Sequence, residues 1–233
     1  MMNGIIAALS LGLLGGIIYV ATLAPDRAIR ALLWVFATAL FRIRIEGKEH
    51  IPNTGGALLV ANHVSFADSV LVGYCTPRIP RFLMWRPYFE APVFRYFFQA
   101  LHAIPISVDS PKNTVRALQQ AREALRSGHL VAIFPEGGVT NTGEIGSFER
   151  GFERVLSGTG APIIPMHIDG MYGHPLSTKG GGVLKSWETF WRTPVTVRIG
   201  EPIYGPIESD ALRLRVSGLL DRSLEEPVEA LAG

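Results

Sequence analysis

The first 41 residues differ from the rest of the chain in their pattern of hydrophobic and polar positions. Residues 4–24 form an uncharged run, and about 20 apolar residues are enough for a helix to cross a bilayer. In residues 26–41, apolar side chains surround nearly the whole circumference of a second predicted helix, which is typical of a segment in or against lipid. We therefore predict an N-terminal two-helix membrane anchor over residues 1–45, with a buried helical hairpin as the alternative.

From residue 42 onwards, short runs of strand length are separated by loops and by longer amphipathic segments. Strands are predicted at residues 42–46, 57–61, 79–85, 103–107, 130–134, 161–168 and 193–199. Helices are predicted from a start near Ser65 or Asp68 and over residues 91–101, 111–127, 148–156 and 209–224. Residues 170–191 are left unassigned. This alternation indicates one α/β domain, which we place at residues 46–233.

The charges suggest an orientation for this arrangement. The net charge of +2 is too small to indicate nucleic-acid binding. Five basic residues follow the first apolar run, namely Arg27, Arg30, Arg42, Arg44 and Lys48. Because cytoplasmic flanks of membrane segments are rich in Lys and Arg, we predict the inner (cytoplasmic) membrane, with the globular domain on its cytoplasmic side. A signal peptide fits less well, since no Lys or Arg precedes the apolar run.

Metal and disulfide chemistry find little support in the sequence. The single cysteine, Cys75, excludes a disulfide framework and a cysteine-rich zinc site. His167, Asp169 and His174 are conceivable ligands, but an isolated HxD pattern is more often the end of a strand. We therefore predict no metal.

The most informative stretch is residues 57–70, ALLVANHVSFADSV, in which an apolar run stops at Asn62 and His63. His63 and Asp68 are five positions apart, which is about 140° of rotation on a regular helix. They can meet only if His63 lies in a strand-to-helix turn and Asp68 in the first turn of the helix. A histidine held there by a carboxylate is a placed general base. The alternative is a solvated turn histidine beside a helix cap.

A second informative stretch is Phe134-Pro-Glu-Gly-Gly138, at the end of a predicted buried strand. Glu136 followed by two glycines places a charged group on a backbone that a ligand can approach closely. The alternative is an ordinary strand-to-loop turn.

Together, NHxxxxD and FPEG, followed by Phe148-Glu-Arg-Gly151 and Ile163-Ile-Pro-Met166, resemble the glycerolipid acyltransferase family. That family includes the 1-acylglycerol-3-phosphate acyltransferases, and the resemblance extends from about residue 47 to residue 202. It implies a mixed central sheet flanked by helices. The implied reaction moves a fatty acyl group from an acyl-CoA or acyl-carrier-protein thioester to a free hydroxyl of a lysophospholipid. No further cofactor is implied, and membrane lipids would be partners.

The resemblance also implies roles for individual residues. His63 would be the general base and Asp68 would orient and stabilise it. Glu136 and Gly137 would line the head-group site, and Arg86 and Arg150 would be candidates for the phosphate. Asn62, the first residue of the NHxxxxD motif, and Gly138, the residue after FPEG, complete the set of substrate-site candidates.

Two departures from the family pattern concern charge. The family usually has an arginine just after FPEG, but this chain has Gly138, Val139, Thr140 and Asn141. The family's second block often ends in an arginine, but here Ile106 is followed by Ser107. A phosphodiester lysolipid is therefore an alternative to lysophosphatidate. A lipid or thioester hydrolase and a non-catalytic lipid-binding module are the rival functions, although no GxSxG motif accompanies Ser65.

Overall fold

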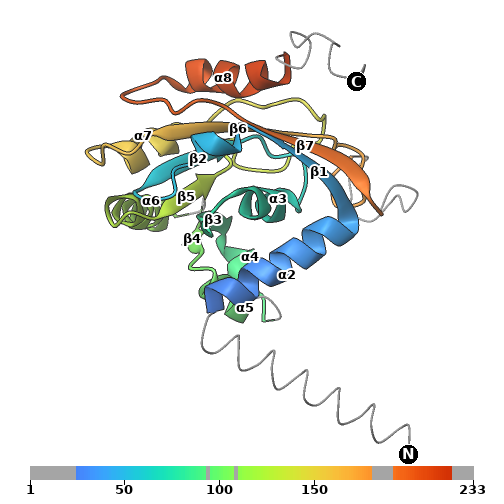
Figure 1. The fold of residues 1–233 in the computed structure, drawn as a ribbon. Helices are drawn as coiled ribbons and strands as arrows, with labels where there is room; N and C mark the ends of the chain where they lie inside the picture. The colour runs from blue at the N-terminus through green and yellow to red at the C-terminus, as the bar shows by residue number, and fades with distance from the viewer. Residues whose placement is uncertain (1–24, 93–94, 108–109, 180–190, 222–233) are drawn as a thin grey trace, which may run out of the picture.

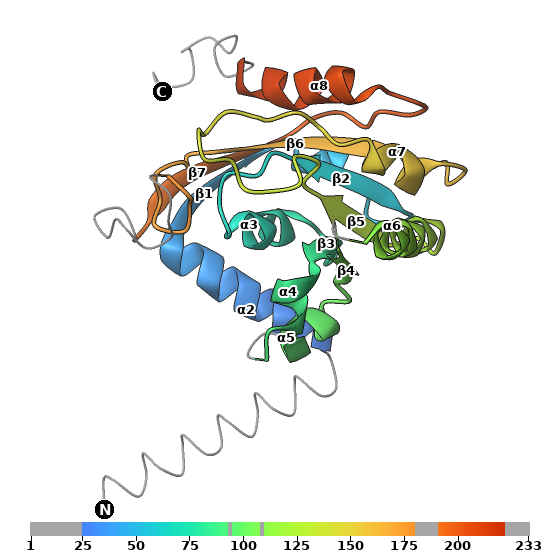
Figure 2. The ribbon, with the colours of Figure 1, turned by 180° about the vertical axis from the view of Figure 1, so that it is seen from behind.

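The computed structural model describes residues 25–92, 95–107, 110–179 and 191–221. Its centre is a seven-stranded sheet in the order β1-β7-β6-β2-β5-β3-β4 (Figures 1 and 2). The strands are β1 (Phe41–Glu46), β2 (Ala57–Ala61), β3 (Arg81–Trp85), β4 (Ile104–Ile106), β5 (Leu130–Ile133), β6 (Ile163–Asp169) and β7 (Thr193–Ile199). Neighbouring strands are parallel except β6 and β7, which are antiparallel. The predicted α/β fold with a mixed sheet is confirmed.

Helices cover both faces of this sheet. They are α2 (Pro25–Leu40), α3 (Asp68–Cys75), α4 (Arg86–Glu90), α5 (Arg95–Ala100), α6 (Pro111–Arg126), α7 (Gly151–Leu156) and α8 (Ser209–Asp221), with the short 3-10 helix η1 (Lys48–His50). In Figures 1 and 2, α8 lies on one side of the sheet and α3 on the other. The sheet is therefore the middle layer of three.

Alternating side chains of β2 explain why this strand is buried on both faces. Leu58 and Val60 pack with residues of α6, α7 and α8, whereas Leu59 and Ala61 pack with residues of α3. All five residues of β2 are buried, as expected for a central parallel strand between two helical layers. Packing on both faces therefore fixes the end of this strand, and His63 follows two residues later.

The predicted elements correspond to elements of the structure, with bounds that differ by up to three residues, except at two places. The expected helix at residues 91–101 is shorter in the structure, where α5 covers Arg95–Ala100, and the sequence reading missed the preceding α4. Five-residue α4 begins directly after β3 with Pro87 near its start, a position that proline favours. The described part of the unassigned stretch, residues 170–179, contributes turns and one bridge, between Ser177 and Ser65.

The N-terminal prediction is only partly covered by the described residues. The first expected helix, residues 4–24, lies outside them. The second is present as α2, which packs on α3 through residues that include Leu33 near Gly73. Within the described ranges, no helix is both long and apolar enough to cross a membrane. The boundary predicted between residues 45 and 46 falls within β1, all six residues of which pair with β7.

Candidate active site

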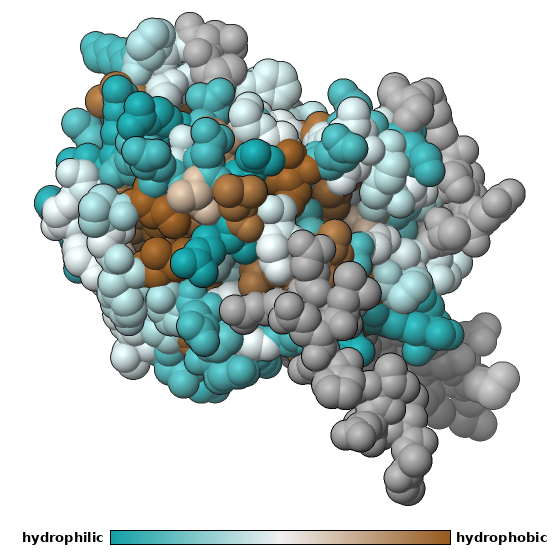
Figure 3. All heavy atoms as spheres, turned by 90° about the horizontal axis from the view of Figure 1, so that it is seen from above, coloured by the Kyte–Doolittle hydropathy of each residue, from teal (hydrophilic) through white to brown (hydrophobic). Residues whose placement is uncertain are grey.

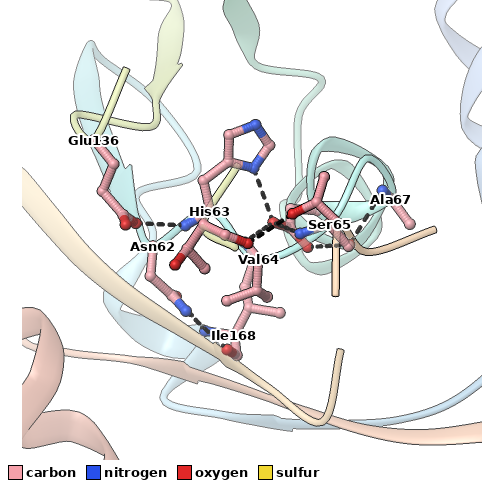
Figure 4. Close-up of polar contacts among 10 residues, drawn as sticks. Asn62, His63, Val64, Ser65, Ala67, Glu136 and Ile168 are labelled. Atoms are coloured by element: carbon pink, nitrogen blue, oxygen red, sulfur yellow. Dashed lines mark hydrogen bonds and ion pairs between the residues drawn. The ribbon is translucent and has the colours of Figure 1, made fainter. Parts of the chain in front are cut away.

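The turn after β2 is organised around Asp68, the first residue of α3, whose side chain is fully buried. Its Oδ2 accepts hydrogen bonds from His63 Nδ1 at 2.9 Å, from the Val64 N–H at 2.7 Å and from the Ser65 N–H at 2.8 Å (Figure 4). Its Oδ1 accepts from the Ser65 hydroxyl at 2.5 Å. Donors therefore surround the buried carboxylate, and charge-assisted hydrogen bonds of this kind are stronger than neutral ones.

The ring of His63 is held on two sides. Nδ1 donates to Asp68, and the ring stacks on Phe134 with 4.1 Å between centroids and 14° between planes. Because Nδ1 carries the hydrogen, the lone pair of the neutral ring is on Nε2, which points away from the carboxylate in Figure 4. The His63 side chain is 19% exposed, so a substrate can reach it. The expected meeting of His63 and Asp68 across a strand-to-helix turn is therefore present.

Glu136 connects the FPEG stretch to residues 62–67 between β2 and α3, which we call the histidine turn. Its Oε1 accepts from the His63 N–H at 2.7 Å, and its Oε2 accepts from the Gly146 N–H at 2.8 Å. The Thr140 N–H donates to the His63 carbonyl at 2.8 Å, so the loop after β5 holds both polar groups of the His63 backbone. Burial raises the pKa of the Glu136 carboxyl, although the two amide hydrogen bonds act in the opposite direction. Both carboxylate oxygens are thus engaged by backbone amides.

Asn62 and Ser65 are buried beside the pair, and their polar groups are in use. The Asn62 amide donates to the Ile168 carbonyl at 2.9 Å and accepts from the Ile168 N–H at 2.7 Å, which joins the ends of β2 and β6. The Ser65 hydroxyl donates to Asp68 and accepts from the Ala67 N–H. Since Ser65 is fully buried, its hydroxyl is not presented to a substrate as a nucleophile.

The other substrate-site candidates lie at the surface. Gly137 and Gly138 are exposed, and Gly137 has a left-handed φ of 75°. Arg86 pairs with Glu90 at 2.8 Å within α4, and its side chain is 47% exposed. Arg150 pairs with Glu153 at 3.0 Å, and this hydrogen bond and the Glu153 charge raise the pKa of its guanidinium. Each of the two arginines therefore has a carboxylate partner of its own.

The sequence reading missed the contribution of residues 170–179, which cross the histidine turn. The Leu176 carbonyl accepts from the Phe66 N–H at 2.9 Å, and the Thr178 hydroxyl donates to the Thr140 carbonyl at 2.8 Å. The only sequence signal was the concentration of glycines and aromatic residues, which predicts a hydrogen bond neither to Phe66 nor to Thr140. We call residues 170–179 the strap.

A cavity of about 410 Å³ lies behind the end of β2, between α8 and the loop at residues 143–145. Asn62 and Val64, the neighbours of His63, contribute to its lining together with residues of β6, the strap and α8. Figure 3 views this side of the molecule from above and shows apolar residues gathered between hydrophilic ones. His63 and Asp68 are not part of this lining. The candidate active site is therefore the surface around His63, outside this cavity.

The conceivable metal ligands are not gathered in one place. Within the part of the chain that the structure describes, no group of three or more His, Cys, Asp or Glu residues is arranged to hold a metal ion. Asp169 pairs with Arg198 at 3.6 Å, and Arg198 also pairs with Glu46 at 3.2 Å. These ion pairs join β6, β7 and β1.

Comparison with known proteins assigns the family. Residues 42–169, more than half of the chain, match the family model described as Acyltransferase. The chain belongs to the acyltransferase family. The expected membership of the glycerolipid acyltransferases is confirmed, because the matched curated relatives include proteins named 1-acyl-sn-glycerol-3-phosphate acyltransferase.

Three relatives of this acyltransferase illustrate the similarity. The chloroplastic protein LPAT1 of Arabidopsis thaliana is 29% identical over 75% of this chain and 48% of its own length. A Pseudomonas aeruginosa relative is 28% identical over 66% of this chain and 64% of its own length. The crystal structure titled 1-acyl-sn-glycerophosphate (LPA) acyltransferase, PlsC, from Thermotoga maritima has a TM-score of 0.66 and 26% identity, covering 91% of this chain and 86% of that one. The match thus spans about half the length of the Arabidopsis relative.

The raised pKa of Glu136 predicts how the free energy of unfolding depends on pH. Native Glu136 keeps its proton at pH values at which an unfolded glutamate, with an ordinary pKa of 4.5, has lost it. The stabilisation linked to this proton is complete below pH 4.5 and is lost as the pH rises through the raised pKa. We expect the unfolding free energy of wild type minus that of Glu136→Gln to fall as the pH rises through this window.

Urea denaturation of both proteins in detergent, at several pH values, measures this difference. Glu149→Gln, at an exposed glutamate that follows the same loop, is the matched control. A difference that grows with pH in this window would contradict the expected sign.

Proposed function

We propose that this protein transfers a fatty acyl group from an acyl-CoA or acyl-carrier-protein thioester to a free hydroxyl of a lysophospholipid. Acceptors of the 1-acylglycerol 3-phosphate type are the first candidates, because the matched relatives carry that substrate in their names. The single observation that carries the proposal is the His63–Asp68 pair, in which a 2.9 Å hydrogen bond at Nδ1 orients a histidine side chain that is 19% exposed.

The proposed mechanism needs only these two side chains for proton transfer. Nε2 of His63 takes the proton from the lysolipid hydroxyl while the hydroxyl oxygen attacks the thioester carbonyl carbon. Asp68 stabilises the resulting imidazolium through Nδ1, as a carboxylate does for histidine in other acyl transfers. The tetrahedral intermediate collapses, the carbon–sulfur bond breaks, and His63 returns the proton to the departing sulfur. No covalent enzyme intermediate forms.

The rival functions differ from this proposal in their requirements. A serine hydrolase needs an accessible nucleophile, whereas Ser65 is buried and engaged by Asp68. A hydrolase that uses water at His63 would share the catalytic pair and would differ only in its acceptor. A non-catalytic lipid-binding module would not need a histidine held by a buried carboxylate.

We also propose attachment to the cytoplasmic side of the membrane, through the predicted anchor and the surface of α2. Four large apolar side chains of α2 are exposed, namely Leu32, Trp34, Val35 and Phe36. A second exposed group lies beside the histidine turn, where Tyr88 makes edge contacts with Phe66 at 5.9 Å and with Trp85 at 5.3 Å. Burial of a large apolar side chain contributes about 1.5–3 kcal/mol, so lipid contact at these positions is favourable.

The catalytic pair predicts a large effect of one substitution. His63→Ala should lower kcat for acyl transfer by about a hundredfold or more, because no other group takes the hydroxyl proton. The measurement is release of free thiol from acyl-CoA, with lysophosphatidate or water as the acceptor. His129→Ala, at an exposed histidine in the turn before β5, is the matched control and should retain the rate. Near-normal transfer by folded His63→Ala protein would contradict the mechanism, and thiol release without acylated lipid would favour the hydrolase.

The membrane proposal predicts hydrophobic attachment. In vesicle flotation, the full-length protein should stay with anionic vesicles in high salt, since salt screens charges but does not weaken apolar burial. The double substitution Trp34→Glu and Phe36→Glu should weaken vesicle binding by at least about tenfold. Val115→Glu, at an exposed apolar position on α6, is the matched control. Release by high salt alone, or equal losses in both variants, would contradict this surface assignment.

A further inference from the structure

The surface around His63 lacks an obvious cation for an acceptor phosphate. The loop from residue 135 to residue 149 contains no Lys or Arg and carries three glutamates, Glu136, Glu144 and Glu149. Arg86 is paired with Glu90 of the same helix, and Arg150, which immediately precedes α7, is paired with Glu153 of that helix. A phosphate bound beside His63 would therefore need a cation from another segment.

The strap, residues 170–179, brings a cation to this loop. Thr178 donates its hydroxyl hydrogen to the Thr140 carbonyl at 2.8 Å, and the Thr140 N–H donates to the His63 carbonyl at 2.8 Å. Lys179, the next residue, is exposed. Two hydrogen bonds thus connect Thr178, the residue before Lys179, to the backbone of His63.

A second set of contacts positions the Lys179 side chain. Its Nζ lies 5.0 Å from the centre of the Tyr172 ring, a cation–π arrangement. The Tyr172 hydroxyl donates to the Asn141 carbonyl at 3.1 Å, and the ring lies against Gly143, where a Cβ would come within 2.7 Å of it. The lysine is therefore held over the same loop that lacks cations. Among the described residues, no carboxylate forms an ion pair with it.

We propose that Lys179 binds the phosphate of the lysolipid acceptor and so contributes to acceptor selectivity. This inference rests on the proposed acyl transfer to lysophospholipids. An ammonium group can donate hydrogen bonds to the oxygens of either a phosphomonoester or a phosphodiester, and its attraction is greater for the more highly charged monoester. The phosphate-binding charge that the FPEG stretch lacks would thus come from the strap.

Steady-state kinetics of the full-length protein test this role. Lys179→Met should raise KM for lysophosphatidate by about five- to tenfold with kcat changed by less than about twofold, as expected for loss of one partly exposed charge-assisted contact. The increase should be smaller for lysophosphatidylethanolamine and absent for a monoacylglycerol, which has no phosphate. Lys179→Arg should retain most of the affinity. Lys112→Met, at an exposed lysine on α6, is the matched control and should behave as wild type.

A binding measurement separates this inference from the proposed function. Titration calorimetry with short-chain lysophosphatidate, without an acyl donor, should show a similar weakening of Kd in Lys179→Met. If wild type binds lysophosphatidate in this Lys179-dependent way but transfers no acyl group, the inference stands and the proposed function fails. Unchanged Kd and KM in Lys179→Met, or an equal rise in KM for monoacylglycerol, would overturn the inference.

Discussion

The geometry of this site depends on one buried carboxylate. Asp68 has no exposed surface, and a charge in such a place is stable only where hydrogen-bond donors surround it. Three of its donors belong to the turn that immediately precedes α3, namely the Val64 amide and the amide and hydroxyl of Ser65. The fourth is the His63 ring, so the interaction that shapes the turn also orients the proposed general base. The contacts that fold this turn are therefore the same contacts that orient His63.

The rest of the structure supports this turn from two directions. Glu136 and Thr140 hold the backbone of His63 from the loop after β5, while Phe134 supports its ring. On the other side, Asn62 connects the end of β2 to β6. The family resemblance suggests Asn62 and Glu136 as substrate-site residues. In the structure, the polar atoms of both side chains are hydrogen-bonded within the protein itself. These hydrogen bonds position the turn that holds His63.

Much of this arrangement could be predicted from the sequence, and the reasons are local. The apolar run of β2, the turn at Asn62 and the carboxylate five residues after His63 predict both the strand end and the contact between His63 and Asp68. The FPEG stretch likewise predicts a charged group at the end of β5. The strap could not be predicted, because its place depends on the Ser65–Ser177 bridge and on the Thr178 hydrogen bond, between residues far apart in the sequence. The pairing of Arg86 and Arg150 with glutamates depends on side-chain conformation, and α4 is too short for periodicity to reveal it.

The most direct test of the central claim is the protonation of the two ring nitrogens of His63. Long-range ¹H–¹⁵N correlation spectra of histidine-labelled protein in detergent distinguish a protonated from an unprotonated ring nitrogen. The spectra would be recorded at about pH 8, with His63→Ala used to assign the signal. The account predicts a hydrogen on Nδ1 and a free lone pair on Nε2. A neutral His63 ring with its hydrogen on Nε2 would contradict the account, because that nitrogen could not then accept the proton of the lysolipid hydroxyl.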